Sequence, residues 1–161
     1  MIHIRAATLA DAKRLAELRW EFRTGREAPS ETHDAFVRRC VAWMRRELQE
    51  GHAWRAWVAV GNGVIVGQVW LQTIPKIPNP VAESEQHAYL SNLYVEPSER
   101  GGLGTRLVEV AVEWSRANGI DRVVLWPAHR SVSLYLRFGF THAGDVMELQ
   151  TGKGPKLEGR N

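Results

Sequence analysis

Apolar and polar positions alternate along this chain with two different periods, and each change of period marks a predicted element. Residues 2–6 read as a short first strand. Thr8 and Asp11 then form an acidic variant of the capping-box signal that starts a helix. The apolar positions of this helix are spaced by three or four residues: Ala12, Leu15, Leu18 and Phe22. One face of the helix is therefore expected in the core.

A second helix is predicted over residues 32–49, after a loop that contains Gly25 and Pro29. Its apolar side chains share one stripe: Phe36, Cys40, Trp43, Met44 and Leu48. Four arginines largely avoid that stripe: Arg38, Arg39, Arg45 and Arg46. These arginines are therefore expected to face solvent.

The middle of the chain predicts a β-hairpin followed by a long loop. Residues 54–60 alternate with period two, and residues 64–74 continue as a second strand. Between them, GNG at residues 61–63 supplies the left-handed conformations of a tight turn. Residues 75–86 carry three prolines, which cannot donate to a strand ladder. This loop is long enough to form one wall of a binding site.

The following segments predict a β-α-β unit. Residues 88–95 read as a strand, residues 103–118 as a helix that stops at Gly119, and residues 121–126 as a short, fully buried strand. The crossover helix makes the two strands parallel neighbours, joined with a right-handed connection.

The last part of the chain predicts a short helix, one more strand and a tail. The helix is expected over residues 131–138 and the strand over residues 140–149. Residues 151–161 are expected to form a flexible C-terminal tail. The 161 residues fit a single domain, which we expect over residues 1–150.

Composition narrows the class of protein. With 44% hydrophobic and 24% charged residues, the chain is expected to be soluble and globular. Its net charge of +3 favours the binding of anionic small molecules. The sequence lacks the dense stripes of lysine and arginine that are typical of a nucleic-acid-binding protein. Cys40 is the only cysteine, so no internal disulfide or cysteine-rich zinc site is expected, and no metal is predicted. Residues 1–15 lack the unbroken apolar stretch of a secretory signal, and no window approaches a membrane span, so a cytoplasmic protein is expected.

The segment VEPSERGGLGTRL, residues 95–107, runs from a strand through glycines into an amphipathic helix. Such a junction presents backbone N–H groups that the first helical turn leaves unpaired, and the helix dipole adds about half a positive charge there. Gly101, Gly102 and Gly104 let the backbone approach a phosphate, and Arg100 adds a fork-shaped contact. A diphosphate fits this chemistry, and a merely tight turn is the structural alternative.

Two familiar phosphate-binding motifs fit the same segment poorly. A Walker loop ends in Gly-Lys-Ser/Thr, which is absent here. A dinucleotide fingerprint needs a third glycine, which GGLGTR lacks.

A second motif, SLYLRFGF at residues 133–140, places Tyr135 on a predicted helix four residues before Gly139. The strand, glycine turn, helix, buried strand and tyrosine-bearing helix together resemble the GNAT superfamily of acyl-coenzyme A-dependent N-acetyltransferases over nearly the whole chain. The resemblance implies a mixed α/β (α+β) fold with a mostly antiparallel central sheet. One parallel strand pair would be splayed, and helices would cover both faces.

The resemblance also implies site residues. The pyrophosphate of acetyl-CoA would be held at the glycine turn: Arg100, Gly101, Gly102, Leu103, Gly104 and Thr105. The pantetheine arm would pair with the bulged, splayed strand: Leu93, Tyr94 and Val95. Tyr135 would protonate the departing thiolate.

The glycine turn departs from the family pattern Arg/Gln-x-x-Gly-x-Gly/Ala. Anchoring that pattern on residues 102–104 puts Glu99 in the basic position, whereas anchoring it on Arg100 requires a turn one residue shorter. The shorter turn is favoured because Glu99 would repel a diphosphate.

The asparagine usual before the tyrosine helix is also missing, since Ala128 holds its place. This removes one side-chain contact to the coenzyme. Arg130 or Ser131 is expected to replace it, and Ser131 is retained as a cofactor-binding candidate.

The acyl acceptor needs a base, because an alkyl amine with a pKa of about 10.4 must lose a proton before it attacks a thioester. The candidate bases lie just before or at the start of the splayed strand: Glu83, Glu85 and His87. Of these, Glu85 is predicted to be the catalytic base. A backbone N–H near Leu93 is expected to stabilise the oxyanion.

The acceptor site is expected between the first two helices, their loop and residues 75–86. Trp20, Glu21 and Arg23 lie where the first helix meets its loop, and Trp20 and Glu21 are retained as acceptor-binding candidates. A core tryptophan and surface charges explain these residues equally well.

These observations predict an N-acetyltransferase that moves an acetyl group from acetyl-CoA to the amine of a small molecule or peptide by direct attack on the thioester. The alternative is a non-catalytic acyl-CoA-binding or sensor domain on the same fold. No nucleic-acid or membrane partner is expected, since the helix arginines are interleaved with Glu47 and Glu50. An exposed sheet edge is compatible with a homodimer.

Overall fold

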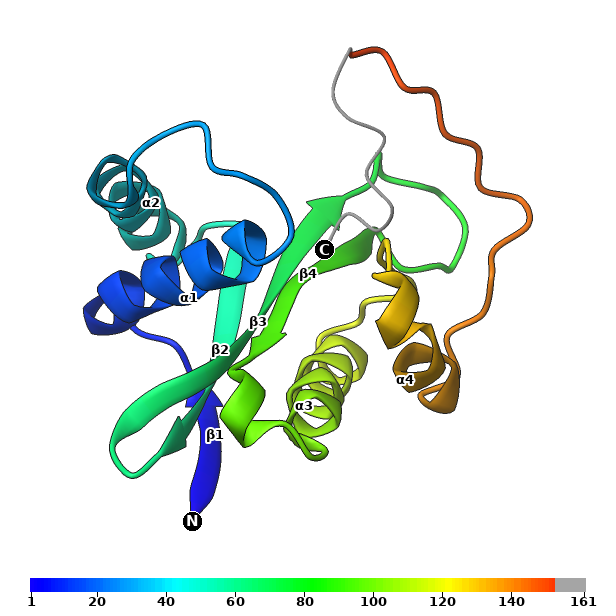
Figure 1. Ribbon diagram of the computed structural model, residues 1–161. Coiled ribbons are helices and arrows are strands. Elements are labelled where there is room, and N and C mark those ends of the chain that lie inside the picture. The colour runs from blue at the N-terminus through cyan, green and yellow to red at the C-terminus, as the bar shows by residue number, and fades with distance from the viewer. Residues whose placement is uncertain (153–161) are drawn as a thin grey trace. The chain divides into compact units, whose positions relative to one another are not determined.

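The computed structural model describes residues 1–152, and the chain divides into two units, Met1–Val124 and Leu125–Asn161 (Figure 1). The expected C-terminal tail, from residue 153 onward, lies outside the described residues. The first unit contains β1 (Ile2–Ala6), α1 (Ala12–Thr24), α2 (His33–Glu47), β2 (Trp54–Gly61), β3 (Val64–Pro75), β4 (Gln86–Val95), α3 (Leu103–Ala117) and β5 (Val123–Val124). The described part of the second unit contains α4 (Val132–Arg137).

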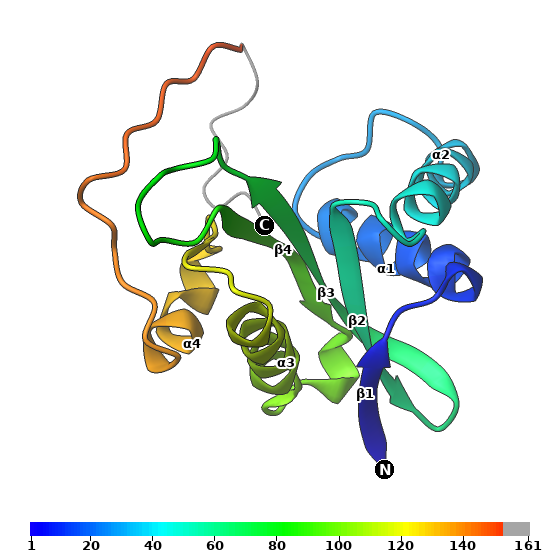
Figure 2. The ribbon, with the colours of Figure 1, turned by 180° about the vertical axis from the view of Figure 1, so that it is seen from behind.

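One five-stranded sheet with the order β1-β2-β3-β4-β5 organises the first unit. Neighbouring strands are antiparallel except for β4 and β5, which run parallel and pair Ala88 with Val123 and Tyr89 with Val124. Helices α1 and α2 cover one face of the sheet and α3 covers the other (Figures 1 and 2). This arrangement confirms the predicted fold class.

The start of α1 is fixed by the predicted capping residues. The Thr8 N–H donates to Asp11 Oδ2 at 2.7 Å, and the Arg5 guanidinium holds both oxygens of the same carboxylate at 2.8 and 2.9 Å. The Arg5 hydrogen bonds, aided by Thr8, lower the pKa of Asp11 from 3.8 to about 2. A single 3₁₀ turn, Leu9–Asp11, leads into the helix.

The hairpin between β2 and β3 turns at the predicted position. Asn62 has a φ of 49° and Gly63 a φ of 77°, which are the left-handed conformations that a two-residue hairpin loop requires. The arginines of α2 are exposed, as its apolar stripe predicts: Arg38, Arg39, Arg45 and Arg46.

The core between α1, α2 and the sheet contains a cluster of aromatic rings. The ring centroids of Trp43, Trp54 and Trp70 lie 5.7 to 6.2 Å apart, and the Tyr89 ring lies 6.1 Å from that of Trp54. On the opposite face α3 packs closely, since a Cβ at Gly67 would lie 3.2 Å from Leu107 Cδ1. Bulky aliphatic side chains of α1 and the sheet fill the rest of the core: Leu15, Leu18, Val58, Leu71 and Leu90.

Two strand predictions were wrong. Residues 140–149 form no strand, because Met147 and Leu149 are 95% and 84% exposed and bury too little apolar surface to order an extended segment. The predicted strand over residues 121–126 is reduced to Val123 and Val124, which are half-buried rather than fully buried.

Candidate active site

A bulge interrupts β4 near its carboxyl end. Gln68 of β3 faces Tyr94 and Trp70 faces Ser91, so Asn92 and Leu93 together oppose a single β3 residue. Asn92 takes the left-handed φ of 54° that this bulge needs. Pairing with β5 involves only Ala88 and Tyr89, so within the described residues the part of β4 beyond Tyr89 has no strand partner on that side. The bulge and the splayed parallel pair agree with the sequence-based expectation.

The glycine turn follows directly after β4. A 3₁₀ turn, Pro97–Glu99, leads to extended Arg100, and Gly101 and Gly102 then take φ values of 136° and 94°. A Cβ at either glycine would meet nothing within 4 Å, so backbone conformation rather than crowding requires glycine here.

The first turn of α3 presents the backbone donors that the sequence predicts. The Arg106 N–H donates to the Gly102 carbonyl at 3.1 Å, so the N–H groups of residues 103–105 precede the helical ladder. Leu103 is 4% exposed and anchors this end of the helix in the core. The turn therefore offers several amides and a helix N-terminus to an anion.

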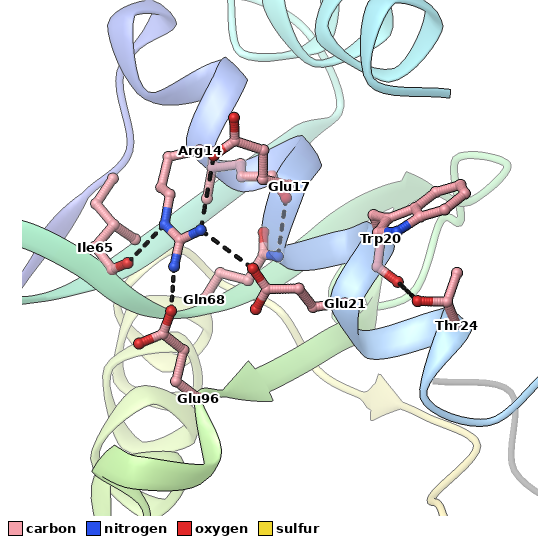
Figure 3. A network of polar contacts seen from close by, with 9 residues as sticks. Arg14, Glu17, Trp20, Glu21, Thr24, Ile65, Gln68 and Glu96 are labelled. Atoms are coloured by element: carbon pink, nitrogen blue, oxygen red, sulfur yellow. Dashed lines mark hydrogen bonds and ion pairs between the residues drawn. The ribbon is translucent and has the colours of Figure 1, made fainter. Parts of the chain in front are cut away.

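Arg14 on α1 ties the start of this turn to the sheet (Figure 3). Its Nε donates to the Ile65 carbonyl of β3 at 3.1 Å, and its Nη2 pairs with the Glu96 carboxylate. Its Nη1 lies 3.3 Å from Glu21 Oε1 and 3.6 Å from Glu17 Oε2. Glu21, a predicted acceptor-binding residue, is therefore engaged in an ion-pair network.

Trp20 is placed differently from its neighbour Glu21. Its ring packs edge-on to His33 at 5.3 Å and against Phe36 at 5.6 Å, at the start of α2. Figure 3 shows Glu21 extended toward Arg14, whereas the Trp20 ring lies away from Arg14, and the Trp20 carbonyl accepts a hydrogen bond from the Thr24 hydroxyl. The structure thus places the two predicted acceptor residues on one helix but in separate clusters.

Arg19 on α1 is a residue that sequence reasoning missed. Its Nη1 donates to the Asn92 amide oxygen at 3.1 Å, which connects it to the bulge of β4. Burial, and then the nearby charge of Arg23, lower its pKa to about 10. The available signal was its spacing, because it follows Leu15 by four residues and precedes Phe22 by three, which puts it beside the apolar stripe.

The candidate bases lie around the start of β4. Asn79 donates from its backbone to Glu85 at 3.3 Å and from its side chain to Glu83 at 2.7 Å, and both carboxylates are on the exposed loop. Glu85 precedes Asn92 by seven residues. At about 3.3 Å per strand residue this is about 23 Å, so Glu85 and the bulge lie at opposite ends of β4. His87 is half-buried within the strand.

Tyr135 and Ser131 belong to the second unit. Tyr135 lies on α4 and is 2% exposed, with its ring 5.5 Å from that of Phe140. Ser131 precedes α4, and its N–H donates to the carbonyl of buried Ala128 at 2.8 Å. The predicted tyrosine is thus a buried residue of a short helix.

A bulged strand that is splayed from its parallel neighbour and followed by a glycine-opened helix is the arrangement that the resemblance to acyl-coenzyme A-dependent acetyltransferases implies. Residues 12–140 match the sequence profile of the Acetyltransferase (GNAT) family, and the chain belongs to that family. Acetyl transfer is the chemistry that the description of this family names.

Solved structures share this fold. A protein described as a predicted acetyltransferase from Clostridium acetobutylicum, crystallised with acetyl-CoA, matches with a TM-score of 0.77 and 22% identity, over 93% of this chain and 96% of its own. A GCN5-related N-acetyltransferase from Ralstonia eutropha matches with a TM-score of 0.76 and 24% identity, over 94% and 100%. An acetyltransferase from Trypanosoma brucei matches with a TM-score of 0.68 and 25% identity, over 93% and 99%. No curated protein sequence matches the chain.

Residues 1–152 contain neither a candidate membrane span nor a candidate metal site. None of the helices there is both long enough and apolar enough to span a bilayer. No group of three or more histidine, cysteine, aspartate or glutamate side chains in the same residues is arranged to hold a metal ion.

Proposed function

We propose that the protein is an N-acetyltransferase that moves an acetyl group from acetyl-CoA to the amine of a small molecule or peptide by direct attack on the thioester. One observation carries this proposal: among the described residues β4 pairs with β5 only at Ala88 and Tyr89, so the bulged end of β4 has an unpaired edge directly before the glycine-opened start of α3. A donor-binding strand edge and an anion site therefore follow each other along the chain.

The donor would be held by backbone groups. Arg100, Gly101, Gly102, Leu103, Gly104 and Thr105 would bind its pyrophosphate, and Leu93, Tyr94 and Val95 would pair with its pantetheine arm. The two left-handed glycines and the amides ahead of the helical ladder fit a diphosphate. Arg100, directly before Gly101, would add the charged contact, and Ser131 would add a further polar contact to the coenzyme.

The acceptor amine must lose a proton before it attacks. Glu85 would take this proton along a chain of several waters, because its carboxylate lies in the loop at the start of β4, about 23 Å along the strand from the bulge. The Leu93 N–H would stabilise the oxyanion, and one such donor contributes about 3–4 kcal/mol in other acyl-transfer enzymes. Trp20 and Glu21 would contact the acceptor, and the Tyr135 hydroxyl would protonate the thiolate as it leaves.

Residues 1–150 would form one acetyltransferase domain that acts in the cytoplasm without a metal and can form a homodimer. Calorimetry with acetyl-CoA tests donor binding, and release of free thiol across a panel of amines tests transfer. Binding together with amine-dependent thiol release is the expected result. Binding without release for any amine would instead support a non-catalytic acyl-CoA sensor, and absence of binding would overturn the proposal.

A further inference from the structure

Arg19 is a half-buried cation whose charge has no anionic partner in the described structure. Its recorded hydrogen bond goes to the neutral Asn92 amide oxygen, and none of the ion pairs within residues 1–152 includes it. The nearby Cys40 thiol does not supply a charge, because burial raises its pKa. A guanidinium has five N–H donors, so one neutral acceptor leaves most of its binding capacity unused.

The surroundings of Arg19 add positive rather than negative charge. Arg23 and Arg26 lie within electrostatic range of Arg19, and both contribute to lowering its pKa. The carboxylate of Glu27, three residues beyond the end of α1, pairs with Arg23 at 3.3 Å. The Phe22 ring lies beneath two of these cations, 5.8 Å from Arg19 Cζ and 4.8 Å from Arg26 Cζ.

The position of Arg19 relates it to the proposed reaction. Asn92, its partner, is the left-handed residue of the β4 bulge and directly precedes Leu93, the proposed oxyanion donor. Tyr89, on the same strand, also lies within electrostatic range of Arg19. An anion bound by the remaining donors of Arg19 would therefore sit beside the strand at which the acceptor amine must react.

A purely structural role would be to hold the Asn92 side chain and so the bulge. That role needs one hydrogen-bond donor and no charge, and a neutral amide on a shorter side chain would supply it at lower desolvation cost. A permanently charged, forked group suits a carboxylate or a phosphate, which it binds through two parallel hydrogen bonds.

We propose that Arg19 binds an anionic group on the acyl acceptor, so that the substrates are small amines that carry a carboxylate or a phosphate a few bonds from the reacting nitrogen. This inference rests on the proposed acetyltransferase function and specifies its acceptor class. It assigns α1 a role in specificity, in addition to its role in supporting the glycine turn.

Two matched pairs of acceptors test this: β-alanine against β-alaninamide, and glucosamine 6-phosphate against glucosamine. For the pair whose anion fits, the charged member should have a kcat/KM about tenfold or more above its neutral partner, because charge-assisted hydrogen bonds are strong. The two pairs separate carboxylate from phosphate recognition. In Arg19→Gln this preference should largely disappear, mainly through KM, and Arg19→Lys should restore part of it.

The control variant is Arg45→Gln, which removes an exposed arginine on α2 and should leave the preference unchanged. An equal loss on both members of each pair in Arg19→Gln would indicate a structural role and overturn the inference. Faster acetyl transfer by the wild-type protein to the neutral member of each pair would also overturn the inference.

A binding measurement gives a result that does not depend on turnover. With the protein saturated with coenzyme A, the Arg19 Nε–H resonance should shift on titration with β-alanine or inorganic phosphate and stay in place with β-alaninamide. If neither anion moves this resonance, the inference fails even where amines are acetylated. Failure to bind coenzyme A, by contrast, would count against the proposed function itself.

Discussion

The Arg14 guanidinium on α1 pairs with the carboxylate of Glu96, the first residue after β4, and it also binds a main-chain carbonyl of β3. This one side chain connects the helix that covers the sheet to the point at which the glycine turn begins. The position of the proposed pyrophosphate site therefore depends on α1, which contributes no backbone to it.

Replacing Arg14 with methionine should weaken both folding and donor binding. The Ile65 carbonyl and the half-buried Glu96 carboxylate would lose their partner, which we expect to lower the free energy of unfolding by about 1–3 kcal/mol. The loosened turn should also raise the Kd for acetyl-CoA severalfold. Urea unfolding and calorimetry measure these effects, and Arg45→Met is the exposed control. An unchanged Kd for acetyl-CoA would show that Arg14 does not position the glycine turn.

Gly102→Ala and Gly63→Ala form a matched pair, because both glycines have left-handed φ values and neither would crowd a Cβ. Each change should destabilise the fold by about 1–2 kcal/mol through backbone strain. Only Gly102→Ala should also raise the Kd for acetyl-CoA, since Gly63 lies in the β2–β3 hairpin. Equal affinity in the two variants would argue against the glycine turn as the pyrophosphate site.

Tyr135→Phe keeps the buried ring and removes only the hydroxyl. If this hydroxyl protonates the leaving thiolate, kcat should fall by about tenfold or more, while the Kd for acetyl-CoA stays near the wild-type value. Single-turnover thiol release and calorimetry measure the two quantities separately. A wild-type kcat would remove Tyr135 from the mechanism.

Glu85→Gln tests the proposed base, and Glu83→Gln is its natural control because both exposed carboxylates bind Asn79 in the same loop. At neutral pH the first change should lower kcat/KM by about 100-fold, the usual contribution of general base catalysis, and the second should have little effect. Similar losses in both variants would point to loop structure instead. If kcat/KM fell only in His87→Gln, the half-buried His87 would be the general base instead.

Asp11 should make folding stability depend on acidity. Its folded-state pKa lies at about 2, below its ordinary value of 3.8, so its contribution is present above the ordinary value and is lost as the pH falls toward the folded value. We expect this contribution to be about 1–2 kcal/mol after allowance for partial exposure of Arg5. Asp11→Asn should therefore be destabilised in urea at neutral pH and approach the wild type in strong acid. A constant difference across this range would contradict the assignment.

Residues 1–124 were largely predictable because each element there carries a local signal that tertiary packing agrees with. The capping pair at Thr8 and Asp11, the turn at Asn62 and Gly63, and the glycines before α3 each restrict the backbone on their own. Family resemblance, rather than periodicity, predicted a bulge in the strand before the glycine turn, at Leu93 to Val95, and the structure has it at Asn92 and Leu93.

The failures occur where local pattern does not determine burial. The apolar residues within 140–149 suggested a strand, but a strand needs a partner, and Met147 stays exposed. Arg19 was missed because a helical arginine beside an apolar stripe resembles a surface residue until the facing strand is known. Only the structure shows that this strand presents Asn92 to it.

The three indoles of Trp43, Trp54 and Trp70 pack edge-on or tilted against one another and also provide an intrinsic optical probe. Chromophores this close couple electronically, so the folded state should show an exciton signature in circular dichroism that vanishes on unfolding. Because Tyr89 links the Trp54 ring to the neighbourhood of Arg19, occupancy beside β4 should alter the intrinsic emission without any attached dye.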